Sequence, residues 1–248
     1  MTLFLGDIHG AFHRLIKRIE SKDITGVNII QVGDFGIGFQ SFEKDRDMIG
    51  GLNQFLADRF INLYAIRGNH DDPDFFKEDP LGNTPLKFSN VKFIPDYTVK
   101  EIDGMKMLFV GGALSIDRKP RIQGHKPGSV PSYWEGEGFN FDKDKLMSLD
   151  LKNLDIIVAH TSPEFAWPQT MGSIVYSYAK NDLDLIRDLD HERANVTNFY
   201  KTIDEEMECA PKKYIYGHFH STHSTPYKET EFKLLNIDEF YELSKDKL

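Results

Sequence analysis

Residues 2–10 read TLFLGDIHG, an apolar run that stops at a glycine and is followed by Asp7 and His9. A short apolar run of this kind is typical of a buried strand that ends in a glycine turn. The same arrangement returns at residues 27–34 and at residues 61–69, where the runs end in Gly-Asp and in Arg-Gly-Asn. The sequence therefore predicts three buried strands with polar side chains at their carboxyl ends.

Helices are expected between these strands. Apolar residues recur at helical spacing within residues 12–19, and residues 42–58 show a looser pattern of the same kind. An alternation of strand and helix implies parallel strands that are joined by right-handed crossovers. The first part of the chain is therefore expected to form a parallel sheet covered by helices.

The middle of the chain changes character. Residues 91–94, 98–102 and 105–112 are predicted to be antiparallel strands, because an Asp-Gly hairpin signal joins the last two. Residues 114–140 are rich in glycine, proline and charge and show little periodicity. Since long irregular segments are often functional, we expect an irregular insert there, near the rim of the active site.

The last hundred residues return to regular patterns. Residues 155–159 and 213–216 are predicted to be strands, residues 231–237 a closing strand, and a helix is expected around residues 196–207. These elements add up to an α/β protein in which two packed sheets are flanked by helices. No repeat or low-complexity block divides the sequence, so we expect a single domain over residues 1–248.

The composition is that of an ordinary globular protein, with 248 residues, 40% of them hydrophobic and 28% charged. A net charge of −9 without any basic tract argues against a protein that holds long nucleic acid. The sequence has neither a signal-peptide pattern nor an apolar stretch of membrane-spanning length, so we expect a cytoplasmic protein that does not bind membranes. The single cysteine, Cys209, fits a reducing compartment and excludes a cluster of thiolate metal ligands.

Five short polar motifs lie where the predicted strands end. Each motif is weak alone, because short polar patterns recur by chance. Open α/β folds bind their ligands at the carboxyl ends of their strands, so the five motifs are expected at a shared rim. The motifs are Gly6-Asp7-Ile8-His9-Gly10, Gly33-Asp34, Gly68-Asn69-His70-Asp71, His160, and Gly217-His218-Phe219-His220.

The order of these motifs resembles that of the calcineurin-like metallophosphoesterase superfamily, and the match extends from residue 6 to residue 220. The resemblance implies a four-layer α/β/β/α sandwich of two mixed sheets flanked by helices. It also implies an enzyme that hydrolyses phosphate esters with two metal ions. The superfamily contains protein phosphatases, nucleotide phosphodiesterases and nucleases, so the resemblance leaves the substrate class open.

The resemblance implies a set of seven metal ligands. A carboxylate shared by two ions can hold them at the spacing that an in-line displacement requires, and a hydroxide that bridges the ions would attack phosphorus. Two divalent transition-metal ions suit imidazole and carboxylate ligands, with manganese as the first choice and iron, zinc, cobalt or nickel as alternatives. By family pattern the first ion is held by Asp7, His9 and His220, the second by Asn69, His160 and His218, and both by Asp34.

The resemblance also assigns roles beside the metals. It implies that His70 is a catalytic residue that stabilises the transition state or protonates the leaving oxygen. Asp71 would support this catalytic site from behind the ligands, and a cap on the helical segment at Pro73 is an equally open interpretation. His223 is expected in a surface loop without a catalytic role.

Two positions depart from the protein-phosphatase pattern. That branch has an aspartate and a phosphate-binding arginine where this sequence has Ile37 and Gly38. Arg118 and Arg121 in the irregular segment are therefore predicted to bind the substrate phosphate, because guanidinium groups match phosphate oxygens. The aromatic pair at residues 133–134 would then pack against the organic part of the substrate. The alternative is that both arginines form surface ion pairs with nearby acids.

Together these features predict a hydrolase of phosphate esters, with a phosphomonoesterase acting on a small molecule or a phosphoprotein as the first choice. A phosphodiesterase acting on cyclic or short nucleotides is the alternative. A catalytically inactive scaffold of the same fold is disfavoured, because all seven ligand positions hold competent residues. The resemblance implies a phosphate-ester substrate, and the sequence gives no indication of a protein partner.

Overall fold

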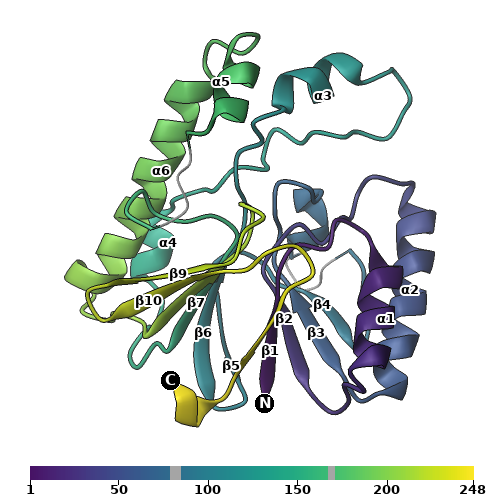
Figure 1. Cartoon of the computed structure of the whole chain (residues 1–248), viewed down its shortest axis with the longest axis vertical. Coiled ribbons are helices and arrows are strands. Elements are labelled where there is room, and N and C mark those ends of the chain that lie inside the picture. Colours follow the sequence, from purple (N-terminus) through teal and green to yellow (C-terminus); the bar gives the residue numbers. More distant parts are fainter. Residues whose placement is uncertain (79–84, 167–170) are drawn as a thin grey trace.

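The computed structural model describes residues 1–78, 85–166 and 171–248, and within them the chain forms two mixed sheets. The first sheet has the strand order β11-β1-β2-β3-β4 (Figure 1). Neighbouring strands from β1 to β4 pair parallel, and β11 pairs antiparallel with β1. The strands are β1 (Thr2–Leu5), β2 (Asn28–Gln31), β3 (Asn62–Ala65), β4 (Val91–Phe93) and β11 (Phe240–Leu243).

The second sheet has the order β5-β6-β7-β8-β10-β9. Its four central strands pair parallel, and the two edge strands, β5 and β9, pair antiparallel with their neighbours. The strands are β5 (Thr98–Ile102), β6 (Met105–Val110), β7 (Ile156–Ala159), β8 (Lys213–Tyr216), β9 (His223–Tyr227) and β10 (Thr230–Leu234).

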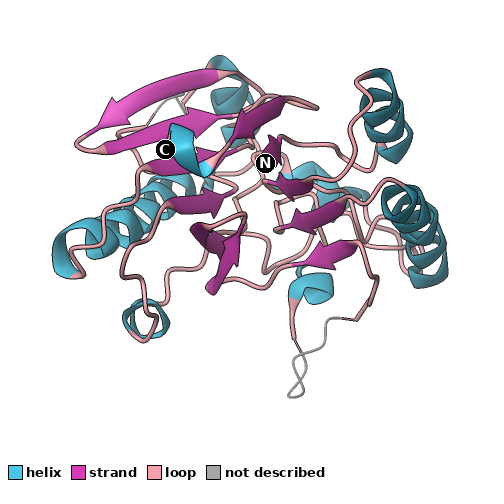
Figure 2. Ribbon diagram, turned by 90° about the horizontal axis from the view of Figure 1, so that it is seen from below, coloured by secondary structure: helices cyan, strands magenta, loops and turns pink. Residues whose placement is uncertain are grey.

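Helices cover the outer face of each sheet. Figure 1 shows α1 and α2 beside the first sheet and α4 and α6 beside the second, and Figure 2 shows the strands between two groups of helices. This is the four-layer α/β/β/α arrangement that the motifs imply. Among the described residues, no helix is both long enough and apolar enough to span a membrane. The helices are α1 (Phe12–Ser21), α2 (Phe42–Asp58), α3 (Arg118–Gly124), α4 (Lys143–Met147), α5 (Ser173–Ala179) and α6 (Leu185–Lys201), with helical turns η1 (Pro73–Phe76), η2 (Thr202–Glu206) and η3 (Lys245–Lys247).

The buried strands send alternate side chains into different layers. In β1, Leu5 packs with the residues of α1 and α2, whereas Phe4 packs between the two sheets. In β2, Ile29 and Ile30 divide in the same way. Successive side chains of a strand point to opposite faces, and both faces of these strands are covered. This is why the strands appear in the sequence as continuous apolar runs.

Two short helices do not belong to the layers. In Figure 1, α3 and α5 lie above the carboxyl ends of the parallel strands, where they form an overhang. Val175 of α5 packs with Leu185 and Leu189 of α6, and these side chains form a small apolar cluster separate from the sheet cores. The overhang is therefore attached to the amino-terminal end of α6.

Three predictions about the elements are wrong. Strand β4, predicted to run antiparallel to the strands that follow it, pairs parallel with β3, and the second sheet begins only at β5. The loop predicted around His223 is strand β9. The segment predicted to be irregular contains α3, a helix with no buried residue, and so with no apolar periodicity to reveal it.

Candidate metal centre

The predicted ligands lie in loops at the carboxyl ends of strands from both sheets. Asp7 follows β1, Asp34 follows β2 and Asn69 follows β3, all in the first sheet. His160 follows β7 and His218 follows β8 in the second sheet. Because the two sheets pack together, these loops meet at one rim, below α3 and α5 (Figure 1). Carboxyl ends of parallel strands are the usual place for ligand sites in open α/β folds.

Four of the predicted ligands form a first group of donors. Asp7, His9, Asp34 and His220 each offer one ligand atom, and these atoms all lie within 4.8 Å of one another. His220 Nε2 lies 3.2 Å from Asp7 Oδ2, and His9 Nδ1 lies 3.7 Å from Asp34 Oδ2. Both carboxylates are buried, whereas the two imidazoles are partly accessible from outside.

The remaining ligands form a second group on the other side of Asp34. Asn69 Oδ1 lies 2.9 Å from His218 Nδ1 and 3.2 Å from His160 Nε2. His160 Nε2 is also 3.2 Å from Asp34 Oδ1. The two oxygens of Asp34 therefore face different groups of donors.

The chemistry of these donors fits divalent transition-metal ions. The two groups contain only carboxylate oxygens, an amide oxygen and imidazole nitrogens, a ligand mixture that suits such ions. His160 Nδ1 lies 2.8 Å from the carbonyl oxygen of Val32. A bond from one ring nitrogen fixes the tautomer and leaves the other nitrogen, Nε2, as the lone-pair donor. The cluster could therefore hold metal.

The backbone is strained at this centre. His9, Asp34, His218 and His220 have φ angles of 46°, 57°, 71° and 49°, in the left-handed region. Non-glycine residues in sparsely populated regions cost about 1–3 kcal/mol each and cluster at functional sites. Glycine is required beside them, because a Cβ at Gly68 would overlap Asp34.

Burial and neighbouring charges shift the pKa values in the centre. Burial alone would raise the pKa of the Asp34 carboxyl, but the charge and hydrogen bond of His160 hold it well below its usual range. Burial lowers the pKa of His218 well below its ordinary value, and His160 adds to this effect. Burial also lowers the pKa of His70, to about 4. Burial would lower the pKa of His160, but the charge and hydrogen bond of Asp34 raise it to about 9. The shifts therefore favour an ionised Asp34 beside a neutral His218 and a charged His160, which must release its proton before it can bind a metal ion.

Asp71 holds two loops together from behind the ligands. Its carboxylate accepts hydrogen bonds from the amides of Gly36 at 2.6 Å and Gly68 at 2.7 Å, and from those of Phe35 and Ile37. The helical turn η1 is capped instead by Asp72, which accepts from the Asp74 amide. The capping interpretation of Asp71 is therefore wrong, and Asp71 joins the loop after β2 to the loop after β3.

His70 lies at the open side of the centre and is met by Arg121 of α3. The distance from Arg121 Nη2 to His70 Nε2 is 2.6 Å. Arg121 Nε also pairs with Asp117 Oδ1 at 2.9 Å, which keeps the guanidinium group in place. Of the two arginines predicted to bind phosphate, Arg121 is the one that the fold brings to the centre.

Arg118 begins the same helix but points elsewhere. Its Nε lies 2.5 Å from Asp182 Oδ2, and its Nη2 lies 2.8 Å from Asp188 Oδ2 of α6. The side chain is 13% exposed and is engaged by two carboxylates. This is the ion pairing that the sequence left open as the alternative, and it ties α3 to α6.

A cavity of about 410 Å³ joins the metal centre to the overhang. One side of it is formed by Asp34, Asn69, His70, His218 and His220, and the other by residues of α3, α5 and α6. The predicted aromatic pair at residues 133–134 does not line this cavity. The ring of Trp134 packs instead on Phe39, which lies next to His70.

Sequence reasoning missed three residues around the centre. Ser115 Oγ accepts from Asn69 Nδ2 at 2.9 Å, which directs the amide oxygen toward the histidines. Glu137 accepts from the Ser115 amide at 2.7 Å. Arg193 of α6 lines the cavity and lies over the ring of Phe219. A single arginine in an amphipathic helix gave no signal in the sequence, and a buried glutamate in an irregular segment gave none either.

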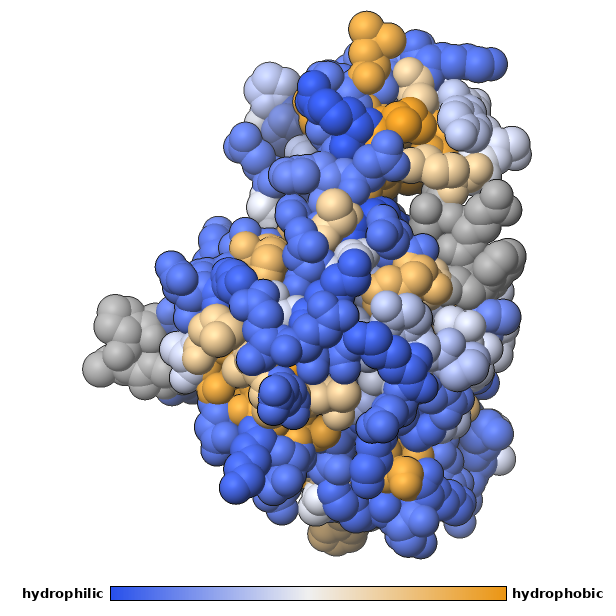
Figure 3. All heavy atoms as spheres, turned by 90° about the vertical axis from the view of Figure 1, so that its left-hand side faces the viewer, coloured by the Kyte–Doolittle hydropathy of each residue, from blue (hydrophilic) through white to orange (hydrophobic). Residues whose placement is uncertain are grey.

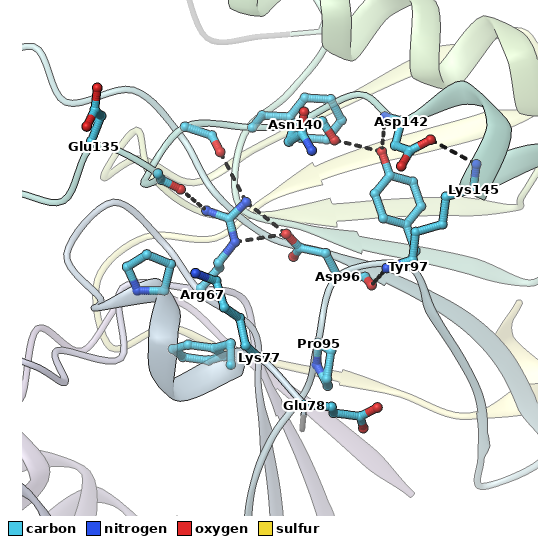
Figure 4. A pocket seen from close by; sticks show the side chains of 15 residues that line it. Arg67, Lys77, Glu78, Pro95, Asp96, Tyr97, Glu135, Asn140, Asp142 and Lys145 are labelled. Carbon is cyan, nitrogen blue, oxygen red and sulfur yellow. Dashed lines mark hydrogen bonds and ion pairs between the residues drawn. The ribbon is translucent and has the colours of Figure 1, made fainter. Parts of the chain in front are cut away.

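A larger cavity of about 780 Å³ lies away from the metal centre (Figure 4). Its central cation, Arg67, pairs with Asp96 at 2.8 Å and donates to the carbonyl oxygens of residues 136–138. Tyr97 donates to the Asn140 carbonyl oxygen and accepts from the Asp142 amide. These polar groups are hydrogen-bonded to one another, so the cavity lies between segments of the chain that they hold together.

Solved structures that are similar to the chain share little sequence identity with it. The phosphopantetheinyl hydrolase of Mycobacterium tuberculosis is 15% identical, with 96% of this chain and 89% of that one covered and a TM-score of 0.44. GAP50, the anchor in the inner membrane complex of Plasmodium, is 15% identical, with 95% and 71% covered and a TM-score of 0.41. No curated protein sequence matches the chain.

The family is established by sequence. The family model for calcineurin-like phosphoesterases matches residues 1–222, a range that contains every motif at the rim. With its polar motifs gathered at the carboxyl ends of two packed sheets, the chain belongs to the calcineurin-like phosphoesterase family.

Proposed function

We propose that the chain is a phosphomonoesterase that works with two divalent transition-metal ions. The observation that supports this most strongly is the position of Asp34, whose two oxygens face separate groups of donors. One ion would be held by Asp7, His9 and His220, the other by Asn69, His160 and His218, and Asp34 would be shared. Manganese is the first choice for these ligands.

The bound ions would supply a water molecule that loses its proton near neutral pH, together with positive charge for the phosphoryl oxygens. Hydrolysis forms a bond from the water oxygen to phosphorus and breaks the bond from phosphorus to the leaving oxygen, which takes up a proton. His70, which lines the cavity at the open side of the centre, would face that leaving oxygen. The ligands and the loops behind them would keep this geometry fixed.

Arg121 would bind the phosphoryl group. Its guanidinium donates to a neutral imidazole nitrogen of His70, and a phosphoryl oxygen is a charged and therefore stronger acceptor. Turning from His70 to the phosphate would also leave His70 free for the leaving oxygen. A cationic fork beside two ions suits a dianionic monoester better than a monoanionic diester, which supports a monoesterase.

The proposal is tested by hydrolysis of a panel of esters. Protein loaded with manganese would be assayed against a phosphomonoester, a phosphodiester, a cyclic nucleotide and a phosphopeptide, before and after chelation. We expect the highest kcat/KM for the monoester and no hydrolysis after chelation. Full activity in protein that elemental analysis shows to be metal-free would overturn the metal mechanism, and higher activity on the diester would overturn the substrate class.

Two variants separate ligands from the catalytic residue. Asp34→Asn should weaken the binding of both ions, because it alters a carboxylate that both share. His70→Ala should keep the metal content and slow turnover by roughly 10²–10⁴, the usual worth of a positioned acid–base group. Asp47→Asn on the exposed face of α2 serves as the control. Equal metal loss in His70→Ala and Asp34→Asn would contradict these roles.

A further inference from the structure

The cavity beside the metal centre has two unlike sides. Its floor carries the predicted ligands, and its opposite wall is apolar. That wall comes from three segments: the loop after β6, helix α5 and helix α6. Its apolar residues are Ile116, Ile174, Val175, Tyr178 and Leu189, with Phe219 beside the metal ligands.

The charged side chains near the wall are engaged by other groups of the protein, and Arg193 of α6, which lines the cavity, donates to the Ser162 carbonyl oxygen and lies over the ring of Phe219. Asp117 is held by Arg121, and Arg118 points away from the cavity because Asp182 and Asp188 engage it. Arg118 therefore contributes no positive charge to the wall. A leaving group rich in hydroxyls would lose its water there and find few partners, and unpaired polar groups are costly to bury. The wall thus disfavours sugar-like and glycerol-like leaving groups.

The segment that carries the wall, α5 and the residues after it, also exposes apolar surface to water. Ile174 and Tyr176 of α5 are 59% and 55% exposed, and Leu183 just after α5 is 92% exposed. Figure 3 shows apolar atoms gathered at the top of the molecule, where α5 lies in Figure 1. Exposed side chains of this kind cost little singly, but Ile174 also lines the cavity, so part of this surface belongs to the wall. Apolar surface next to a polar reactive centre is the usual composition of a small-molecule site.

The size of the cavity limits what can lie against the wall. At roughly 30 Å³ for each water molecule, a volume of about 410 Å³ equals roughly a dozen water molecules. This is room for a phosphoryl group and one or two flat rings. We propose that the wall is the binding site for the leaving group, and that the preferred substrate is a small phosphate monoester of an aromatic or similarly apolar alcohol. This inference rests on the proposed function, since it assigns the substrate class of the same site.

The experiment measures binding rather than turnover, because aromatic leaving groups are also chemically more reactive. Non-hydrolysable phosphonates are titrated into metal-loaded protein by calorimetry. The probes are benzylphosphonate, methylphosphonate and 2-hydroxyethylphosphonate. We expect benzylphosphonate to bind at least tenfold more tightly than the other two. Equal affinity for all three, or tightest binding of the hydroxyethyl compound, would overturn the inference.

Two tyrosines of α5 provide a matched pair of variants. Tyr178 lines the cavity, whereas Tyr176, one half-turn earlier, lies outside its lining and is exposed. Tyr178→Ala should weaken benzylphosphonate about tenfold and leave methylphosphonate unchanged, and Tyr176→Ala should change neither. Ile174→Ser, at an exposed position that folding tolerates, should repeat the loss for benzylphosphonate. If Tyr178→Ala weakened the binding of both phosphonates equally, the wall would affect only the metal centre, and the inference would be overturned.

The outcome is independent of the hydrolysis panel. If no ester is hydrolysed but benzylphosphonate still binds best and depends on Tyr178, the proposed activity fails and the apolar site stands. If monoesters are hydrolysed and the three phosphonates bind alike, the proposed activity stands and the leaving-group site fails.

Discussion

At the scale of single residues, two arginines three positions apart on α3 have different partners. Arg121 donates to His70 at the metal centre, and Arg118 is engaged by Asp182 and Asp188. Residues three positions apart lie only about 60° from each other around a helix, so the two side chains start on neighbouring positions of one face and extend to different partners, the metal centre for Arg121 and α6 for Arg118. The two arginines carry the same charge but have different structural roles.

Replacing each arginine by alanine should separate these tasks. Arg121→Ala should lower kcat/KM for a monoester by roughly 10- to 100-fold, the worth of a hydrogen bond to a charged group, without changing metal content. Arg118→Ala should lower the thermal midpoint and reduce kcat/KM less than Arg121→Ala does. Steady-state kinetics, elemental analysis and thermal unfolding of both variants check this. A larger kinetic loss in Arg118→Ala would contradict the difference between the two arginines.

Some residues of the site could be predicted from the sequence and others could not. Asp7, Asp34 and Asn69 were predicted to lie together because each follows an apolar run, and the run alone places it at the end of a strand. Arg118 and Arg121 could not be distinguished, because α3 buries no side chain and leaves no periodic pattern. Arg118 pairs with Asp182 and Arg121 contacts His70, and both partners are far away in the sequence, so no local pattern predicts these contacts.

At the scale of elements, the loops after β2 and β3 are joined by one carboxylate. Asp71 accepts from amides of both loops, and these loops carry Asp34 and Asn69. Asp71→Asn introduces an N–H among amide donors, so at least one bond is lost and one buried donor is left unpaired. We expect the free energy of unfolding to fall by about 1–3 kcal/mol.

The neighbouring residue provides the control for this prediction. Asp72 caps η1, and asparagine is an equally good helix cap, so Asp72→Asn should change stability little. Denaturant unfolding of both variants would be compared with that of the parent chain. Equal stability of Asp71→Asn and the parent chain would mean that the four amides do not depend on the charged acceptor.

Elements with a clear sequence pattern were predicted well, and edge strands were predicted less consistently. The bounds of α2, β5 and β8 agree with the predicted ranges, because apolar pattern and turn signals coincide there. The direction of β4 was wrong, since a short apolar run does not encode which neighbour it pairs with. Strands β9 and β11 were missed because partly exposed edge strands lack a continuous apolar run.

At the scale of the whole molecule, stability should depend on a buried acid outside the metal ligands. Glu137 is 2% exposed, and burial raises the pKa of its carboxyl to about 7, against the opposing hydrogen bonds of Ser115. A carboxyl with a higher pKa in the folded chain than in the unfolded chain binds its proton more tightly when folded. Its ionisation therefore removes stability as pH rises from about 4.5 toward 7, by about 3 kcal/mol in all.

Glu137→Gln should remove this dependence, because glutamine keeps the acceptor for Ser115 and does not titrate. The variant should gain stability relative to the parent chain between pH 4.5 and pH 8, and the difference should level off above pH 8. Urea unfolding at several pH values measures it. Parallel stability curves for the two chains would show that Glu137 is not protonated in the folded protein at low pH.

The four-layer arrangement follows from the sequence through its alternation of strands and helices and through the motifs at the strand ends. The overhang does not, because it is built from short helices whose apolar residues meet only through α6. The fold class and the rim were thus predictable, and the wall of the cavity was not.

The pairing of β1 with β11 joins residue 2 to residue 243. During synthesis on the ribosome, β1 emerges before the other strands and can pair with β2 about thirty residues later, but its other edge has no partner until β11 has been made, more than two hundred residues after β1. An unpaired strand edge is a template for association with other chains, and contacts of such long sequence separation form slowly. The nascent protein therefore carries an exposed strand edge until β11 has been made, and its yield in cells should respond to chaperones that bind extended segments.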